Sequence, residues 1–540
     1  MLKEKGGQIM KKVILLILVA ALLCTGCMGL GVWYLYPAYS DMEYVRPDTA
    51  RMEALLEECC TGVENAKTAD QALKYVFDYY DAYDDFYTNY NLAYIRYCGD
   101  TTDLYWEEEY NFCAEYTSMP DSGLEQLYRA AAGCQLRDEL EKEYFGEDFF
   151  LAYDGEALWD ETFTDLMQQE SKLLEQYYAI CGEDTDSFAD ESAFYDQYAS
   201  QLIEIYRQLV LLRKQIAAHA GYDGYPQFAY DYYYSRDYSP QQMKDYYAQL
   251  QQYLVPLYVQ LDSTHWEGAS ETCGQAQTLA YTRTAAKAMG GKVWEAFSLL
   301  ERRGLYDIAY SEKKHNISFE VYLSTYGTPF VFMCPTGTDY DKLMLTHEFG
   351  HFVNDYVCGG SYAGTDVAEV HSQAMEYLSL CYADAGALEH YKMADCLATF
   401  VEQSAMGLFE HAVYEMEAES LTEAAILDTY AQIGSAFGFD NWQWDPREFV
   451  LTAHYYEYPM YIDSYVVSND VAFQIYQRER QTAGAGLEVY QQCVESEESW
   501  LVTFTETYGL ESPFAEGRLP EVARTLEQVL QLTGEVQVAA

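Results

Sequence analysis

The chain of 540 residues exceeds the roughly 300 residues at which single hydrophobic cores stop growing, so it is not a small binding module. Its composition, 50% hydrophobic and 22% charged, excludes a largely disordered protein. Lysine and arginine total 32 against 87 acidic residues, and the net charge of -55 excludes nucleic acid as a partner. The acidity keeps the protein soluble or attracts cationic peptides.

The N-terminus predicts a membrane anchor. Two lysines precede an uncharged stretch over 13–36, which is long enough to span a bilayer and carries its positive charges on the N-terminal side. If translation starts at Met10, the same stretch resembles a signal peptide, and the small residues before Cys27 resemble a bacterial lipoprotein cleavage site. The anchor is either a lipid on Cys27 or the uncleaved apolar segment. In both cases residues 1–40 are expected to tether the rest of the chain outside the cytoplasm, on a bacterial cell surface.

Beyond the anchor the dominant pattern is helical. Prolines are few, 12 in all, and apolar residues recur at intervals of three and four. The clearest case runs over 198–217, where the apolar face consists of Leu202, Ile205, Leu209, Leu212 and Ile216. Similar stretches over 52–80 and 166–180 predict further helices, so the fold is expected to be mainly α.

One region departs from the helical pattern. Residues 317–334 alternate between apolar and polar on both sides of a break at Gly327-Thr328-Pro329, which predicts two short strands. A helix is expected next, beginning near Tyr340 and ending at Gly359-Gly360, because glycine ends helices at low steric cost. A small sheet therefore precedes this helix along the chain.

The predicted helix contains the sequence His347-Glu348-Phe349-Gly350-His351. Residues four apart project from the same face of a helix, so the two imidazoles converge on one point, as a tetrahedral metal ion requires. Glu348 leaves the helix about 100° round from His347, where a carboxylate reaches a metal-held water without ligating the metal. The alternative is a pair of histidines on a helix surface.

A catalytic zinc ion takes three protein ligands and keeps a fourth position open for water. A second helix is expected to start near Thr365, and an antiparallel return would bring its first turn opposite His351. Glu369 in that turn is the predicted third ligand for one zinc ion. Glu376, two turns along the same face, is the alternative ligand or a partner that orients an imidazole. His371, two residues from Glu369, is a further candidate for the lining of the pocket.

Five segments together resemble the oligoendopeptidase F and thimet oligopeptidase family, a gluzincin-like family of zinc metallopeptidases: 347–351, 368–373, 326–330, 213–222 and 454–465. The resemblance implies a mainly α fold in which two helical lobes flank a deep substrate channel. It also implies a small sheet at the channel rim next to the helix with the two histidines, and zinc at the channel floor. In this family the glutamate at the position of Glu369 is the third zinc ligand.

The same resemblance bears on a histidine- and tyrosine-rich run late in the chain. It implies that His454, Tyr461 and Tyr465 hold the substrate and stabilise the developing oxyanion. The run is about one residue longer than is usual in the family, which leaves Tyr458 as an alternative to Tyr461. Pro459 suits the first turn of the helix that follows.

The predicted function is that of a zinc metallopeptidase, a metalloendopeptidase of the oligopeptidase type that hydrolyses short unfolded peptides. Glu348 would accept a proton as zinc-bound water attacks the peptide carbonyl. Residues 41–200 are expected to form an N-terminal helical region and 201–540 the catalytic region, with the membrane contacted only through the N-terminal segment.

Two alternatives remain. One is a zinc peptidase of another class, with an open cleft that acts on whole proteins. The other is a catalytically silent surface lipoprotein or binding protein that retains the fold.

Overall fold

The computed structural model describes residues 36–154, 160–181, 191–360, 363–442, 444–496 and 498–532. The predicted anchor over 13–36 lies outside these ranges, apart from Tyr36. Within them, no helix has both the length and the apolar character that a membrane span needs. The anchor therefore stays a prediction from the sequence.

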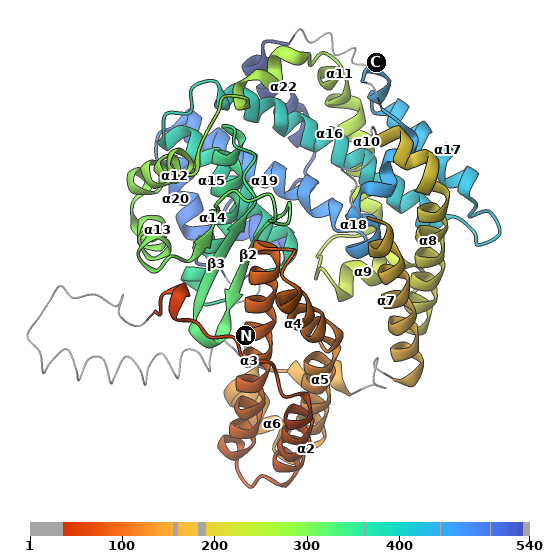
Figure 1. Cartoon of the computed structure of the whole chain (residues 1–540), viewed down its shortest axis with the longest axis vertical. Helices are drawn as coiled ribbons and strands as arrows, with labels where there is room; N and C mark the ends of the chain where they lie inside the picture. Colours follow the sequence, from red (N-terminus) through yellow and green to blue (C-terminus); the bar gives the residue numbers. More distant parts are fainter. Residues whose placement is uncertain are drawn as a thin grey trace, which may run out of the picture. The chain divides into compact units, whose positions relative to one another are not determined.

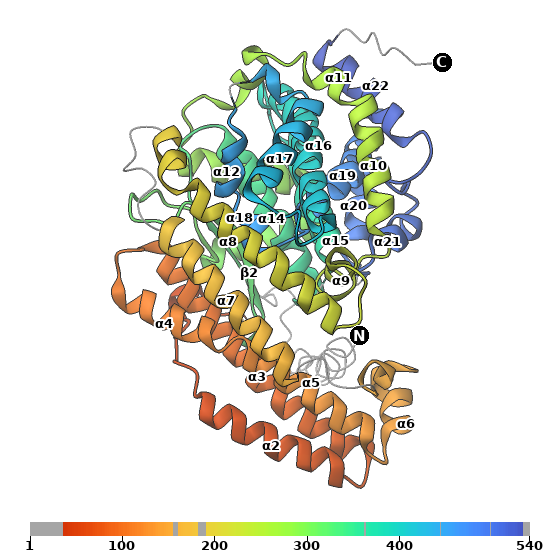
Figure 2. The same cartoon turned by 90° about the vertical axis from the view of Figure 1, so that its right-hand side faces the viewer.

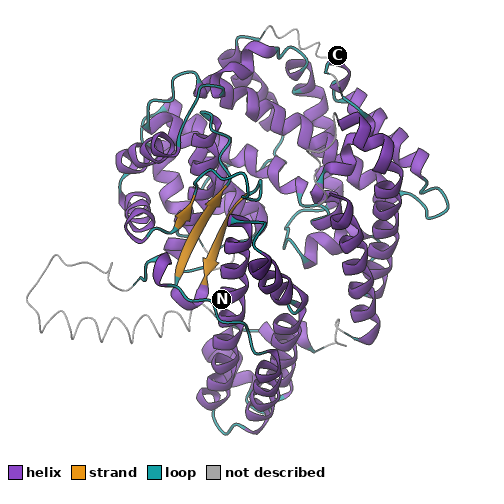
Figure 3. Cartoon of the chain, in the orientation of Figure 1, coloured by secondary structure: helices purple, strands orange, loops and turns teal. Residues whose placement is uncertain are grey.

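The described chain is mainly α, as predicted, with a small sheet (Figure 3). Contacts between residues divide the chain into two units, each built from several segments. The first unit takes its described residues from Met1–Ala157, Gly290–Gly337 and His351–Ser361. The second takes them from Leu158–Met289, Thr338–Gly350 and Tyr362–Ala540. The predicted division into an N-terminal helical region and a catalytic region stays a prediction.

The α-helices of the first unit are α2 (Thr49–Asn65), α3 (Ala69–Gly99), α4 (Leu104–Glu115), α5 (Ser118–Gly133), α6 (Arg137–Leu140) and α13 (Gly291–Arg303). Helices α2, α3 and α5 lie side by side (Figures 1 and 2) and bury a common apolar core that includes Val63, Val76 and Leu127. This unit therefore has a hydrophobic core of its own.

The helical stretch predicted over 52–80 is divided between α2 and α3, because the chain turns between them. The side chain of Thr68 accepts a hydrogen bond of 3.3 Å from the backbone N–H of Gln71, which caps the start of α3. Apolar periodicity continues on both sides of this turn, so the pattern alone did not reveal it.

The sheet of the first unit has the strand order β1-β3-β2, with β1 (Tyr306–Asp307), β2 (Ser318–Leu323) and β3 (Thr328–Met333). Strand β3 pairs in parallel with β1 and antiparallel with β2, where Phe319 lies opposite Phe332. The turn between β2 and β3 contains Gly327 at φ +64°, a conformation that glycine adopts readily. The two predicted strands are confirmed, whereas the two-residue β1 was too short to predict.

The described part of the second unit has no strand longer than one isolated β-bridge between Thr272 and Thr338. Its α-helices are α7 (Glu161–Cys181), α8 (Glu191–His219), α9 (Tyr225–Tyr232), α10 (Pro240–Tyr253), α11 (Val255–Tyr258), α12 (Gln275–Met289), α15 (Thr365–Tyr382), α16 (Leu388–Glu415), α17 (Glu423–Ala436), α18 (Ala453–Glu457), α19 (Ile462–Gln481), α20 (Ala485–Cys493), α21 (Leu501–Thr507) and α22 (Arg518–Leu530). Helices α15 and α19 pack closely against each other and both are almost entirely buried (Figure 1). The predicted helices over 166–180 and 198–217 are confirmed as parts of α7 and α8.

Helix α14 (Tyr340–Cys358) begins and ends where the sequence predicted. It is followed by Gly359 and Gly360, both with positive φ, which end the helix without the steric cost that a side chain would incur. The division between the two units falls inside α14, after Gly350. Because α14 is one continuous helix, His347 and His351 keep the fixed relation of residues four apart.

Candidate metal centre

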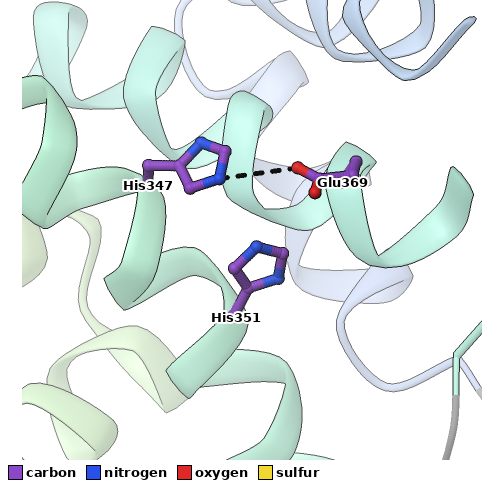
Figure 4. A group of neighbouring side chains, drawn as sticks. All are labelled: His347, His351 and Glu369. Atoms are coloured by element: carbon purple, nitrogen blue, oxygen red, sulfur yellow. Dashed lines mark ion pairs between the residues drawn. The ribbon is translucent and has the colours of Figure 1, made fainter. Parts of the chain in front are cut away.

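The two histidines of α14 and a glutamate of α15 converge on one point, as predicted. His347, His351 and Glu369 each offer one ligand atom, and these atoms lie within 4.8 Å of one another (Figure 4). The Nε2 atom of His347 lies 3.5 Å from Oε2 of Glu369. In a tetrahedral site with ligand distances of about 2.1 Å, two ligand atoms lie about 3.4 Å apart. The spacing therefore fits a zinc ion.

A close approach of two helices makes this convergence possible. A Cβ atom on Gly350 of α14 would lie 2.5 Å from the carbonyl oxygen of His371 and 2.6 Å from Cα of Ser372, both in the backbone of α15. A side chain does not fit there, so glycine allows the two helices to approach. Glu369 is thereby brought near His347 although 22 residues separate them in sequence.

The carboxylate of Glu376 lies on the far side of the His347 ring from Glu369. Its Oε1 atom is 2.8 Å from Nδ1 of His347. With a hydrogen on Nδ1, the ring donates a hydrogen bond to Glu376. Its unprotonated Nε2 then faces Glu369 and can bind a metal ion. Of the two roles considered for Glu376, this geometry favours the partner that orients an imidazole.

The carboxylates around His347 favour a positive charge at this site. Burial lowers the pKa of His347, but the hydrogen bond to Glu376 and the charge of Glu369 outweigh burial and raise it to about 9. The carboxylates thus hold a positive charge at neutral pH, which a proton or a metal cation supplies. Two imidazole nitrogens and one carboxylate oxygen form the donor set of known catalytic zinc sites.

Glu348 is a buried carboxylate beside the ligands, with 8% of its surface exposed. Burial raises its pKa to about 7; the nearby His347 acts to lower it, and the charge of Glu369 adds to the rise. A carboxyl group that titrates near neutrality can both accept and return a proton, as a general base requires.

The late histidine- and tyrosine-rich run lies on the Glu369 side of the site. The hydroxyl of Tyr461 donates a hydrogen bond of 2.8 Å to Oε1 of Glu369. Nε2 of His454 lies 3.2 Å from the hydroxyl of Tyr465, and the rings of Tyr461 and Tyr465 are 5.2 Å apart. Tyr458 is 56% exposed and also lies near this group, with its ring 6.1 Å from that of Tyr461.

Burial keeps the two inner phenols protonated. It raises the pKa of Tyr461 and that of Tyr465 well above the ordinary value, and the charge of Glu369 adds to both shifts. Each hydroxyl therefore keeps its hydrogen at neutral pH, and that of Tyr461 donates it to Glu369.

The prediction for Pro459 is wrong. It precedes the first residue of α19, Ile462, by three positions and so lies outside the first turn. Its carbonyl oxygen instead accepts a hydrogen bond of 2.8 Å from the hydroxyl of Tyr234. The segment between α18 and α19 is thus held by contacts from a distant part of the chain rather than by a helix turn.

A buried arginine that sequence analysis missed joins this segment to α15. Arg236 donates to the carbonyl oxygen of Met460 at 2.9 Å and to the hydroxyl of Ser464 at 2.8 Å. Its Nε lies 3.3 Å from Asp366, three residues before Glu369 in α15. Its guanidinium also lies 4.4 Å from the ring centre of Tyr230. Arg236 therefore connects the helix of Glu369 with the segment of Tyr461.

His371 is fully buried, with its ring against those of Tyr490 and Phe504. This environment is that of a core residue. His411 of α16 lies 3.0 Å from Asp463 in the buried network around Arg236.

Comparisons with known proteins agree with the fold. The profile of the peptidase M3 N-terminal domain matches residues 39–155. No curated protein sequence matches the chain. Among solved structures, PZ peptidase A with an inhibitor superposes with a TM-score of 0.80 at 21% identity, covering 92% of this chain and 100% of that one.

Two further structures extend the comparison. A Bacillus anthracis protein described as an oligoendopeptidase F superposes with a TM-score of 0.77 at 22% identity, over 93% of this chain and 99% of its own. The M32 carboxypeptidase of Deinococcus radiodurans gives 0.55 at 12% identity, over 85% and 99%. Residues 39–155 thus match the peptidase M3 N-terminal domain, and the fold of the chain is that of these solved structures, as the resemblance implied.

Proposed function

We propose that this protein is a zinc-dependent peptidase of the oligoendopeptidase type. One observation carries the proposal: His347, His351 and Glu369 bring three ligand atoms within 4.8 Å of one another, beside the buried Glu348. The fold shared with PZ peptidase A supports it. A silent binding protein would have no need for a buried carboxylate next to such a donor set.

His347, His351 and Glu369 would hold one zinc ion. When bound, zinc would polarise a substrate carbonyl and lower the pKa of a water molecule toward neutrality. Glu348, with its pKa near 7, would take a proton from the attacking water and return it to the leaving amine. The hydrogen bond from Nδ1 of His347 to Glu376 would keep the imidazole in the orientation that binding needs.

The histidine- and tyrosine-rich segment over 454–465 would bind the substrate and stabilise the oxyanion. The hydroxyls of Tyr461 and Tyr465 are protonated and their rings lie 5.2 Å apart, so either would donate to an oxyanion that forms at the peptide carbonyl. Tyr461 would do so by exchanging its hydrogen bond to Glu369 for one to the oxyanion. His454, which contacts Tyr465, would orient that hydroxyl or bind the substrate itself. Tyr458 stays an alternative at the solvent-exposed side.

The proposed substrates are short unfolded peptides, in keeping with the names of the oligoendopeptidases whose fold this chain shares. The net charge of -55 would favour encounters with cationic peptides. The protein would act outside the cytoplasm, tethered through residues 1–40; this location depends on the sequence pattern over 13–36 alone.

Mass spectrometry of a peptide library tests the activity. The purified protein should cleave short peptides, lose this activity in a chelator and regain it with zinc. Metal analysis should find about one zinc per chain. Absence of both zinc and cleavage would favour the silent binding protein, and rapid digestion of whole folded proteins would favour a zinc peptidase of another class.

A further inference from the structure

A buried lysine lies behind the imidazole partner of the candidate metal centre. Lys392 is in the first turns of α16 and only 4% of its surface is exposed. Its Nζ lies 2.7 Å from Oε2 of Glu376 and 2.8 Å from Oδ2 of Asp395. It also lies 5.1 Å from the ring centre of Tyr377. Nothing in the function proposed above uses this lysine.

The contacts of Lys392 continue to a metal ligand through one carboxylate. Glu376 places Oε1 2.8 Å from Nδ1 of His347 and Oε2 2.7 Å from Lys392. Each oxygen of this buried carboxylate therefore has a separate cationic or hydrogen-bonding partner. A carboxylate fixed at both oxygens cannot rotate about its last bond without losing one contact.

A lysine fully removed from water is costly, because an ion pays a desolvation penalty that only good pairing offsets. Simple stability does not require it, since well-packed apolar side chains of similar volume often replace buried ion pairs without loss. The buried ammonium group of Lys392 is therefore better explained by its effect on the position of a neighbouring side chain than by its contribution to stability. It holds Glu376, and Glu376 faces the ring of His347.

We propose that Lys392 is a positioning residue of the metal centre. By fixing Glu376, it holds the imidazole of His347 with Nε2 turned toward Glu369. This inference rests on the proposed zinc site, but it concerns residues that do not touch the metal. Lys392 acts only through Glu376, and this restriction makes the inference testable by a double-mutant cycle.

The experiment measures zinc affinity of the full chain by competition with a chelator, and the visible spectrum of the cobalt-loaded protein. The variants are Glu376→Gln, Lys392→Met and the double variant. Loss of a partner that orients an imidazole typically weakens metal binding about 10- to 100-fold. We expect this loss for Glu376→Gln and about 10-fold for Lys392→Met, both with an altered cobalt spectrum.

The zinc affinity of the double variant should equal that of Glu376→Gln within about 2-fold, because Lys392 affects the metal only through Glu376. If the two substitutions acted independently, their losses of affinity would multiply. This comparison holds even if Lys392→Met alone fails to fold, since the double variant leaves no unpaired charge at position 376. The matched control is Lys244→Met, which breaks the ion pair with Glu415 elsewhere in the second unit and should leave zinc affinity unchanged.

Two results would overturn the inference while leaving the zinc site intact. One is a Lys392→Met protein with the zinc affinity and cobalt spectrum of the parent. The other is a double variant weaker than Glu376→Gln by the full factor of the lysine substitution. If the parent protein itself binds no zinc, the proposed function fails instead.

Discussion

The hydroxyl of Tyr461 donates to Oε1 of Glu369 over 2.8 Å, so a residue at the start of α19 touches a candidate metal ligand of α15. The other oxygen of Glu369 accepts a hydrogen bond of 3.0 Å from Ser372. Both oxygens are thus held, one from the same helix and one from the tyrosine segment. This contact ties the proposed oxyanion donor to the proposed metal site.

Tyr461→Phe should lower kcat about 100-fold, because loss of one oxyanion donor typically costs about 100- to 1,000-fold. The zinc affinity should fall by about 10-fold at most, since Ser372 still holds Glu369. The measurement is steady-state hydrolysis of a short peptide. Tyr458→Phe is the matched control: that side chain is 56% exposed and should change kcat by no more than about 2-fold. A loss of kcat in Tyr458→Phe with none in Tyr461→Phe would assign the donor to Tyr458.

Glu348→Gln should abolish most hydrolysis while the protein still binds zinc. Removal of a general base costs about 100- to 10,000-fold, and the amide keeps the shape of the buried side chain. Peptide cleavage and metal content of the same preparation provide the measurement. A variant that retains both zinc and the parental rate would show that Glu348 is not the base.

Much of this site follows from local pattern. The start of α14 near Tyr340, its end before Gly359 and the start of α15 at Thr365 were all predicted, because helix ends depend on nearby residues. Residues four apart on one helix must converge, so His347 and His351 could be paired from sequence. The choice between the roles of Glu376 needed the structure, since it depends on which nitrogen of His347 each carboxylate faces.

The supporting residues could not be predicted, because their partners lie far away in sequence. Arg236 is 130 residues from Asp366 and 224 residues from Met460, and no periodicity links such positions. Lys392 belongs to a different helix from its partner Glu376. Pro459 was misplaced because long-range hydrogen bonds, and not a helix turn, set the conformation of its segment.

Gly350→Ala should weaken zinc binding and lower the free energy of unfolding. The new Cβ would lie 2.5 Å from a carbonyl oxygen of α15, so α14 and α15 must move apart and the ligands with them. Crowding of a packed interior typically costs about 1–3 kcal/mol. Thermal unfolding and chelator competition measure the two effects. Gly133→Ala is the control, because a Cβ there meets nothing within 4 Å; equal behaviour of the two variants would contradict close helix packing as the cause.

Arg236→Met should destabilise the fold by about 3–5 kcal/mol, because it leaves Asp366 and Asp463 buried without their shared cation. Urea denaturation followed by circular dichroism measures the loss. Arg447→Met removes an arginine that is 29% exposed and paired with Asp445 and Asp196, and should cost no more than about 1 kcal/mol. A similar cost for the two arginines would mean that the Arg236 network contributes little.

The buried carboxyl group of Glu410 should make the stability of the protein depend on pH. Its Oε2 accepts a hydrogen bond of 2.9 Å from the backbone N–H of Met460, while Oε1 is buried without a hydrogen-bond partner in the described part of the chain. Burial raises the pKa of Glu410 well above the ordinary value of 4.5, and the charge of Asp463 adds to the rise. Arg213, Arg236 and the Met460 N–H act in the opposite direction without offsetting burial.

The direction of the effect on stability follows from proton binding. Above the pKa of the unfolded chain, the unfolded state has released this proton and the native state still holds it, so stability falls as pH rises toward the folded pKa. Glu410→Gln keeps an oxygen for the Met460 N–H and has no proton to lose. We therefore expect the variant to be at least as stable as the parent at pH 8, with a smaller fall in stability between pH 5 and 8. Thermal unfolding of both proteins across this range measures the difference, and a variant that is less stable at pH 8 would mean that Glu410 is ionised in the native state and paired with Arg213 or Arg236.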